Sequence, residues 1–284
     1  MNNIDASNRI MKKINFYIIS FILLIIAFIQ AYPLIWLTFF SLKDNSEIFG
    51  ENIIGFPRHF LWENYRDALS KGSIGIYFIN SVIVTGLTIL ISGIIGVMAS
   101  YAIARMKWKL SRATLILFIM GLMVPIHASL LPLFIILKNL KLYNTYWALI
   151  IPYVAFAISM GIFIFVGFIQ TIPKELEESA FIDGCSIYRS FISIILPLIK
   201  PAIATVSIFT FLSSWNELMF AIQFISKQQY KTLTVGIMSM VGQYSTKWGP
   251  IGAGLVIATI PTLIIYILMA SQVQKSFTTG AIKG

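Results

Sequence analysis

The feature that most constrains this chain is a series of long intervals that carry almost no Lys, Arg, Asp or Glu. Charged residues make up only 11% of the 284-residue sequence, and they gather in blocks between these intervals. A soluble domain carries about 25% charged residues. Each interval is long enough to cross the ~30 Å hydrocarbon layer of a membrane as a helix of about 20 residues. The chain is therefore predicted to be a membrane protein.

Six intervals of this kind predict six membrane-spanning helices. They lie at Phe16–Phe40, at Ile74–Ala104, at Ala113–Leu137, within Leu142–Ile169, within Ala202–Ser226 and at Trp248–Gln274. Helices are expected because lipid offers no partner for unpaired backbone groups, and these segments lack the alternating pattern of barrel strands. The predicted fold class is all-α, a polytopic membrane protein with six transmembrane helices.

Basic residues beside the spans set the expected orientation. The short loop between the second and third spans contains four of them and no acidic residue, namely Arg105, Lys107, Lys109 and Arg112. This loop is therefore expected to be cytoplasmic. With six spans, both termini and the loop between the fourth and fifth spans fall on the same side.

One membrane domain accounts for most of the chain. Residues 1–15 are expected to form a cytoplasmic amino-terminal segment, residues 16–274 the six-helix domain, and residues 275–284 a cytoplasmic tail. The apolar run after Lys13 resembles a signal peptide, but its uncharged sequence is too long and ends without a small-x-small cleavage site. We expect an uncleaved anchor.

The net charge of +10 does not predict nucleic-acid binding, because the cations are scattered over separate loops, where they interact with anionic lipid headgroups. The two histidines, His59 and His127, are far apart and belong to no metal-ligand pattern. Cys185 is the single cysteine, which excludes an intramolecular disulfide. We expect no metal and no cofactor in this chain.

The loop from Pro173 to Pro201 is the most informative stretch of the sequence. Its pattern predicts two short helices joined by a bend. Asp183 and Gly184 are expected to end the first helix, since glycine adopts the left-handed conformation at little cost. Ser186 can cap the second helix, and Pro197 ends it or redirects it into the fifth span.

Polar ends and apolar middles make this helix-bend-helix amphipathic. A partner protein can bind a surface element of this kind. A plain interfacial helix has similar amphipathicity. The chemistry of the residues leaves both alternatives open.

Glu217 is the one acidic residue inside a predicted span. Ionisable residues at such positions are costly, so they are normally paired or functional. Asn216 can help to satisfy this carboxylate. Two roles stay open for the pair: a hydrogen bond that holds the helix bundle together, and direct contact with a transported solute.

The Pro173–Pro201 loop resembles the EAA loop of bacterial ABC importer permeases. That pattern is Glu-Ala-Ala, two residues, Asp-Gly-Ala, a Phe some six residues on, and Leu-Pro before a further Pro. The matching residues here are Glu178, Ala180, Asp183, Gly184, Phe191, Leu196, Pro197 and Pro201. Two alanines of the pattern are replaced by the small residues Ser179 and Cys185.

The resemblance continues at Asn80–Ser81, at Trp215–Asn216–Glu217 and in the tail from Thr279 to Gly284. These stretches resemble those of the carbohydrate permeases within this family, which are similar to the smaller permease subunit of the maltose transporter. The resemblance implies a type I ABC importer permease fold, with cytoplasmic coupling helices between helices 4 and 5, in a bacterial cytoplasmic membrane.

By the same resemblance, the chain is expected to be one permease subunit of an ATP-driven, binding-protein-dependent importer of a sugar, with an oligosaccharide as the expected substrate. Its partners would be a second permease, an ABC ATPase dimer and an extracytoplasmic sugar-binding protein. Glu178 is the candidate for a salt bridge to the ATPase, and Gly184 for a fixed bend. Gln243 and Tyr244 are candidates for the tip of a loop that reaches the binding protein.

The sequence contains no phosphate-binding loop of the Gly-x-x-x-x-Gly-Lys-Ser/Thr type. ATP and Mg are therefore expected on a separate ATPase subunit, and this chain is not expected to be an enzyme. The alternatives are an ABC permease for a peptide or amino acid and a stand-alone secondary transporter. The latter ideally has inverted repeats and several membrane-buried acids, and only Glu217 fits that description.

Overall fold

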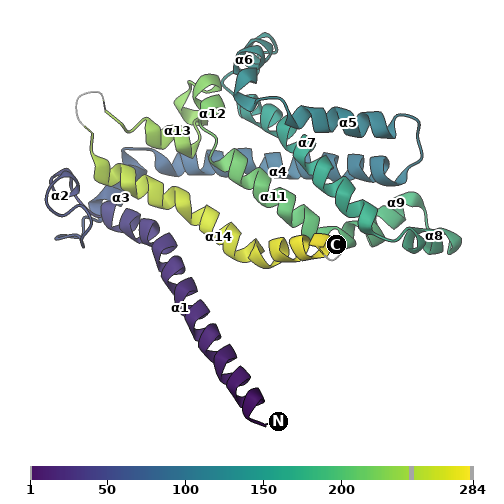
Figure 1. Cartoon of the computed structure of the whole chain (residues 1–284). Helices are drawn as coiled ribbons and strands as arrows, with labels where there is room; N and C mark the ends of the chain where they lie inside the picture. Colours follow the sequence, from purple (N-terminus) through teal and green to yellow (C-terminus); the bar gives the residue numbers. More distant parts are fainter. Residues whose placement is uncertain (1, 243–245, 282–284) are drawn as a thin grey trace. The chain divides into compact units, whose positions relative to one another are not determined.

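The computed structural model describes residues 2–242 and 246–281, with side chains for residues 12–242 and 246–269. Within these ranges the chain is helical and has no strand, as Figure 1 shows. The helices are α1 (Asn2–Phe40), α2 (Asn45–Phe49), α3 (Glu63–Ser70), α4 (Ile74–Arg105), α5 (Ser111–Leu122), η1 (Ile126–Ser129), α6 (Leu130–Asn139), α7 (Trp147–Thr171), α8 (Glu175–Ile182), α9 (Ile187–Ser190), η2 (Phe191–Ile195), α10 (Leu196–Leu198), α11 (Lys200–Trp215), α12 (Met219–Phe224), η3 (Gln228–Tyr230), α13 (Leu233–Met238) and α14 (Trp248–Ala281).

Four helices of the described chain are continuous, apolar and long enough to cross a membrane: α1, α4, α7 and α14. Two further spans are formed if each of two bent pairs counts as one. Helix α5 meets the segment Ile126–Asn139 at 93°, and the segment Ile187–Leu198 meets α11 at 71°. The all-α prediction is confirmed. The third predicted span is broken by the 93° bend. The fifth predicted span, within Ala202–Ser226, is interrupted between the end of α11 at Trp215 and the start of α12 at Met219, whereas the 71° bend precedes it.

Proline chemistry accounts for the break in the third span. Pro125 lies between α5 and η1 with an extended backbone, at φ −62° and ψ 116°. Its nitrogen carries no hydrogen and cannot continue the helical ladder. The helix therefore ends here, and the following segment leaves at 93°.

The chain divides into two compact units. The terminal unit comprises Met1–Gly72 and Met240–Ile257, and the central unit comprises Ser73–Ser239 and Ala258–Gly284. Helix α14 contributes to both units, because the division falls between Ile257 and Ala258.

Side chains bonded to backbone groups hold the turns of the terminal unit. Asn64 donates from Nδ2 to the carbonyl of Lys43 (2.9 Å), and buried Lys43 donates from Nζ to the carbonyl of Asn52 (2.6 Å). Asp44 begins α2, because its carboxylate accepts a hydrogen bond from the Glu47 amide (2.8 Å). That hydrogen bond, with others nearby, lowers the pKa of Asp44 below its usual value.

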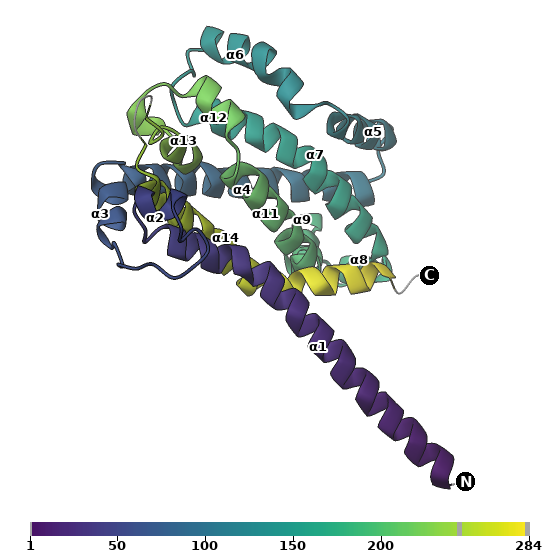
Figure 2. The ribbon, with the colours of Figure 1, turned by 60° about the vertical axis from the view of Figure 1, so that its left-hand side comes forward.

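Helices α4 and α7 form the frame of the central unit. Early residues of α4 and α7 share one buried cluster, which includes Val84 and Leu149, and late residues share another, which includes Val97 and Phe165. The two helices therefore run in the same direction. The chain between them has to return along the unit, and Figure 2 shows α5 beside α7 on this return path.

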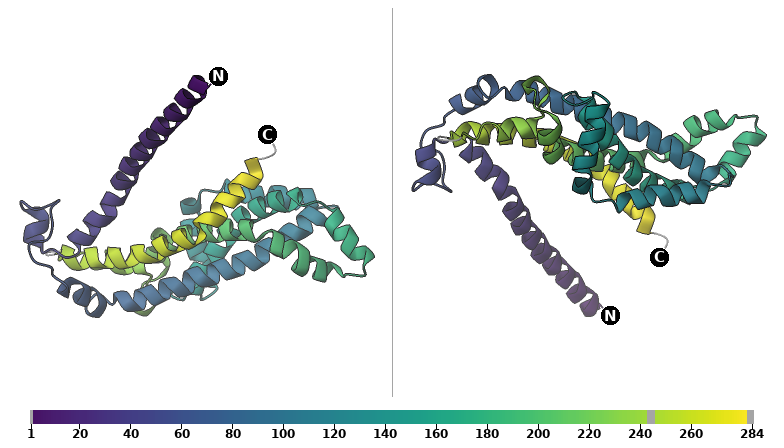
Figure 3. Two further views of the ribbon diagram at one scale, coloured as in Figure 1. Left: turned by 90° about the horizontal axis from the view of Figure 1, so that it is seen from below. Right: turned by 90° about the horizontal axis from the view of Figure 1, so that it is seen from above.

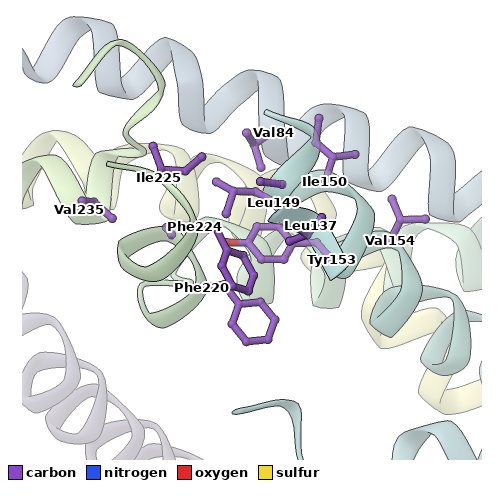
Figure 4. Close-up of a cluster of buried hydrophobic side chains, with 12 residues drawn as sticks. Val84, Leu137, Leu149, Ile150, Tyr153, Val154, Phe220, Phe224, Ile225 and Val235 are labelled. Carbon is purple, nitrogen blue, oxygen red and sulfur yellow. The ribbon is translucent and has the colours of Figure 1, made fainter. Parts of the chain in front are cut away.

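A cluster of aromatic and branched side chains fills one part of the central unit. Figure 4 shows Phe220 and Phe224 of α12 beside Tyr153 of α7, and all three belong to one buried cluster with Leu149. Between helices in lipid, stability comes mainly from close van der Waals packing, because lipid tails are as apolar as the side chains. This cluster therefore fixes the short helix α12 against α7.

Close packing in the central unit predicts opposite effects for two glycine substitutions. A Cβ at Gly236 in α13 would overlap the ring of buried Tyr77, whereas a Cβ at Gly86 in α4 would have no heavy atom from outside its own helical turn within 4 Å. Gly236→Ala is expected to destabilise the unit by about 1–3 kcal/mol, the usual cost of overpacking. Gly86→Ala should cause no loss, because alanine favours helix.

Thermal unfolding of the two purified variants in one detergent checks this prediction. The midpoint should fall for Gly236→Ala and stay at or above the wild-type value for Gly86→Ala. Equal midpoints for both variants would contradict the packing of α13 on Tyr77.

Candidate functional site

The bend in the Pro173–Pro201 loop is built at Gly184. Helix α8 ends at Ile182, Asp183 caps its carboxyl end, and Gly184 follows with φ +77°. Its amide donates to the carbonyl of Phe181 (3.0 Å), which closes the last turn of the helix. An L side chain rarely adopts such a φ value, so glycine is strongly favoured here. The predicted bend is confirmed.

The second helix of the loop starts as expected and continues differently. Ser186 caps α9 by accepting a hydrogen bond from the Arg189 amide (3.4 Å). Pro197 lies inside a helix, preceded by the π-helical turn η2, and the 71° bend falls at Ile199, just before Pro201. Pro197 has no amide hydrogen for a bond to the preceding turn, and a wider turn accommodates this loss.

One side of the loop is exposed and partly apolar. Ile182 on α8 and Tyr188 on α9 are 85% and 78% exposed, and Glu178 and Asp183 are exposed beside them. Ala180 is half-buried. Both views in Figure 3 place α8 and α9 at one end of the central unit.

Phe191 belongs to the opposite, inward side of the loop. Its ring lies 5.0 Å from the ring of Tyr101 on α4, measured between centroids. It packs against a buried cluster that includes Val97 of α4, Ile169 of α7 and Ile195 of η2. The residues matched to the EAA pattern therefore divide into an exposed group around the bend and an inward anchor.

Glu177 is a residue of this loop that sequence reasoning did not single out. It is 4% exposed, whereas its neighbours Glu175 and Glu178 are exposed. Its Oε2 lies 2.6 Å from Nε of Arg105 in a buried ion pair, and its Oε1 accepts a hydrogen bond from the Tyr101 hydroxyl (2.8 Å). The three glutamates look alike in the sequence, so only the fold distinguishes the buried one.

Glu217 lies in a break between two helices and not inside one. Helix α11 ends at Trp215 and α12 begins at Met219. The Oε1 atom of Glu217 accepts a hydrogen bond from the amide of Phe220 (2.9 Å). Its Oε2 atom accepts from the amide of Ala221 (3.1 Å) and from the Tyr153 hydroxyl (2.6 Å).

The carboxylate of Glu217 thus caps α12 and ties the break to α7. The expected pairing with Asn216 is replaced by another one, because exposed Asn216 donates from Nδ2 to the carbonyl of Leu212 (2.9 Å). The reason is geometric: Asn216 caps the end of α11, while Glu217 turns toward the start of α12.

Beside Glu217 the central unit has a cavity of about 310 Å³. Its walls are mostly apolar, and its polar lining residues are Tyr153, Thr210, Ser213, Ser214 and Glu217. Since both oxygens of Glu217 already accept hydrogen bonds within the chain, this geometry supports the bundle-holding role of the carboxylate.

Two polar residues of α4 hold the segment that follows α12. Asn80 donates from Nδ2 to the carbonyls of Gln229 and Lys231, at 2.9 Å each. The hydroxyl oxygen of Ser81 accepts a hydrogen bond from the amide of Leu233 (2.8 Å). The Asn-Ser pair, noticed in the sequence only through a resemblance, therefore satisfies backbone groups where the helix is interrupted.

Asn144 does the same from the turn before α7. Its Oδ1 accepts hydrogen bonds from the amides of Ser226 (2.6 Å) and Lys227 (2.9 Å). The backbone of Asn144 is left-handed, with φ +62°, a conformation that asparagine tolerates better than most residues.

Gln243 and Tyr244, the candidates for the binding-protein loop, lie outside the described residues. In the described part of the chain, no group of three or more His, Cys, Asp or Glu side chains could hold a metal ion.

The capping geometry of Glu217 predicts a graded loss of stability. Glu217→Ala removes the cap of α12 and the link to α7, and should cost about 1–2 kcal/mol. Tyr153→Phe removes one hydrogen bond and leaves the cap, so its loss should be smaller. Thermal unfolding in detergent measures both, and a Glu217→Ala protein as stable as wild type would contradict the capping role.

The sequence of this chain is similar to those of a known protein family. A family model described as "Binding-protein-dependent transport system inner membrane component" matches residues 92–278. The YurM ABC transporter permease protein of Bacillus subtilis is 39% identical over 89% of this chain and 84% of its own length. The trehalose/maltose transport system permease protein MalG of Thermococcus litoralis is 32% identical over 92% of this chain and 94% of its own.

A solved structure has a similar fold. The crystal structure of a bacterial ABC transporter involved in the import of alginate contains a chain that matches with a TM-score of 0.76 at 21% identity. The match covers 93% of this chain and 97% of that one. The predicted ABC importer permease fold is therefore confirmed, and the protein is a multi-pass membrane protein. This chain belongs to the family of binding-protein-dependent transport system inner membrane components.

Proposed function

We propose that this chain is one permease subunit of an ATP-driven, binding-protein-dependent importer of a sugar, and that it forms half of the translocation pathway with a second permease. The observation that carries the proposal is the bent loop of α8 and α9, fixed at Gly184, with an exposed surface at its tip. The names of relatives support the sugar, since they include transporters of sulfoquinovosyl glycerol, trehalose and maltose.

The proposed orientation puts both termini and the loops after α4 and α7 on the cytoplasmic side of a bacterial cytoplasmic membrane. The basic residues after Arg105 support this orientation. An ABC ATPase dimer would then meet α8 and α9, and ATP and Mg would bind to that dimer. An extracytoplasmic sugar-binding protein would deliver the sugar. In another solved structure, at 16% identity and a TM-score of 0.64, a bacterial alginate ABC transporter is in complex with a periplasmic protein bound to an alginate pentasaccharide.

The surface of the loop fits a protein partner better than a lipid layer. Exposed Ile182 and Tyr188 lie near the bend together with the carboxylates of Glu178 and Asp183. Helices that lie on a membrane surface usually carry Lys and Arg beside their apolar side chains, because these bind anionic headgroups, whereas acidic side chains are repelled by them. Glu178, which is exposed on this surface, is the residue proposed to pair with a basic residue of the ATPase.

A stand-alone secondary transporter is the less suitable function. Ion-coupled transporters often use a membrane-buried acid in their coupling or proton relay. Both carboxylate oxygens of Glu217, the acid beside the cavity, are engaged by α12 and Tyr153. An importer of a peptide or amino acid shares the coupling loop, and a transport assay with different solutes separates it from a sugar importer.

Reconstitution tests the dependence on the ATPase. The chain, its permease partner and the loaded binding protein are placed in proteoliposomes with and without the ATPase, and uptake of labelled oligosaccharide is measured after ATP is added. Uptake should require the ATPase, and labelled peptide should not accumulate. Equal uptake with and without the ATPase would contradict the proposal of an ATP-driven importer.

Substitutions at Gly184 test the docking surface. Proline fixes φ near −65°, so Gly184→Pro cannot adopt the observed +77° and should abolish co-purification with the ATPase. Gly184→Asn is the matched control, since asparagine tolerates the left-handed conformation and should retain most of the association. Membrane insertion should be normal in both variants. Normal co-purification of the proline variant would count against the docking assignment.

A further inference from the structure

A buried ion pair joins the coupling loop to the end of α4. The side chains of Arg105 and Glu177 are 7% and 6% exposed, and Nε lies 2.6 Å from Oε2. Removing two charges from water is expensive, and the cost is recovered only with good geometry and further hydrogen bonds. The presence of such a pair therefore needs an explanation. Docking of the ATPase does not explain it, because both side chains are buried within the chain.

The further bonds that such a pair needs are present. Tyr101 donates from its hydroxyl to Oε1 of Glu177 (2.8 Å), and Arg105 donates from Nη2 to the carbonyl of Ile172 (2.7 Å). Both groups that hold Glu177 thus come from α4, where residues four apart lie on one helical face. The last turn of α4 holds the start of the loop and α8 together.

The same turn of α4 also holds the other arm of the loop. The Tyr101 ring packs on Phe191, the first residue of the π-helical turn after α9. One tyrosine therefore contacts both arms, on either side of the bend at Gly184. The tip with Ile182 projects beyond this attachment and is exposed.

We propose that Glu177 is a positioning residue for energy coupling: with Tyr101 and Arg105 it fastens α8 to α4, so that a displacement of the loop by the ATPase moves α4 with it. This inference rests on the proposed function. Helix α4 packs on α7 through residues along its length, so the displacement is passed to the frame of the central unit. Because the pair is buried, salt screens it little.

The proposal separates the roles of two adjacent glutamates. Glu178 is exposed and is assigned to the ATPase, whereas Glu177 is buried and is assigned to α4. Glu178→Gln should therefore reduce association with the ATPase. Glu177→Gln should leave association within about twofold of wild type, keep ATP hydrolysis, and lower ATP-driven uptake at least tenfold. Glu175→Gln neutralises an exposed glutamate of the same helix and serves as the matched control, with uptake near wild type.

A distance measurement gives a readout that loss of stability would not produce. Spin labels are attached in the full transporter at Lys107 and Lys174, two exposed positions beside α4 and α8, after Cys185→Ser removes the native thiol. With native Glu177 the interlabel distance should be the same before and after the ATPase is trapped in its ATP-bound state. In Glu177→Gln it should shift or broaden on trapping, because α8 then moves without α4.

Each result decides the proposal. The proposal would be overturned if Glu177→Gln showed wild-type uptake and an unchanged interlabel distance. It would also be overturned if this variant lost association with the ATPase while the distance stayed unchanged, because Glu177 would then be a docking residue. If Glu177→Gln does not fold, Tyr101→Phe decides, because it keeps the ion pair: reduced uptake at normal association supports the proposal, and wild-type uptake overturns it. ATPase-independent uptake by the unmodified transporter would instead remove the proposed function.

Discussion

Backbone groups within a lipid layer need partners inside the protein, and the architecture of this chain depends on that constraint. Helices satisfy it locally wherever the sequence is uniformly apolar. Where a helix is interrupted, a polar side chain replaces the missing bonds. Glu217 binds the first amides of α12, Asn144 binds two amides after that helix, and Asn80 donates to two carbonyls of the next turn. These three polar residues of the central unit therefore mark its breaks.

This arrangement gives Glu217 a consistent physical account. A carboxylate in an apolar region is costly unless it is bonded, and here it accepts two amides and a tyrosine hydroxyl. The cavity beside it is mostly apolar. The carboxylate keeps α12 in place against α7 by capping a helix whose start no proline or serine marks in the sequence. The loop of α8 and α9 follows the same rule where it contacts α4, because its buried glutamate, Glu177, is paired with Arg105.

The coupling loop shows which structural features a local residue pattern can predict and which it cannot. The bend at Gly184 and the cap at Ser186 were predicted correctly, because glycine and serine each have a specific local role. The inward position of Phe191 and the burial of Glu177 were not predicted. Both depend on the last turn of α4, which is remote in sequence. A local pattern carries no information on which face of a short helix meets a distant one.

The sequence by itself determined that the chain is an all-helical membrane protein, how its apolar segments are divided, and to which family it belongs, since these depend on hydrophobic length and on a spaced motif. Only the tertiary structure decided that the third and fifth spans are broken, that Glu217 caps a helix, and that Glu177 rather than Glu178 faces α4. The physical reason is that a buried carboxylate needs bonding partners, and some of these lie far along the chain, as Tyr153 does for Glu217 and Arg105 for Glu177.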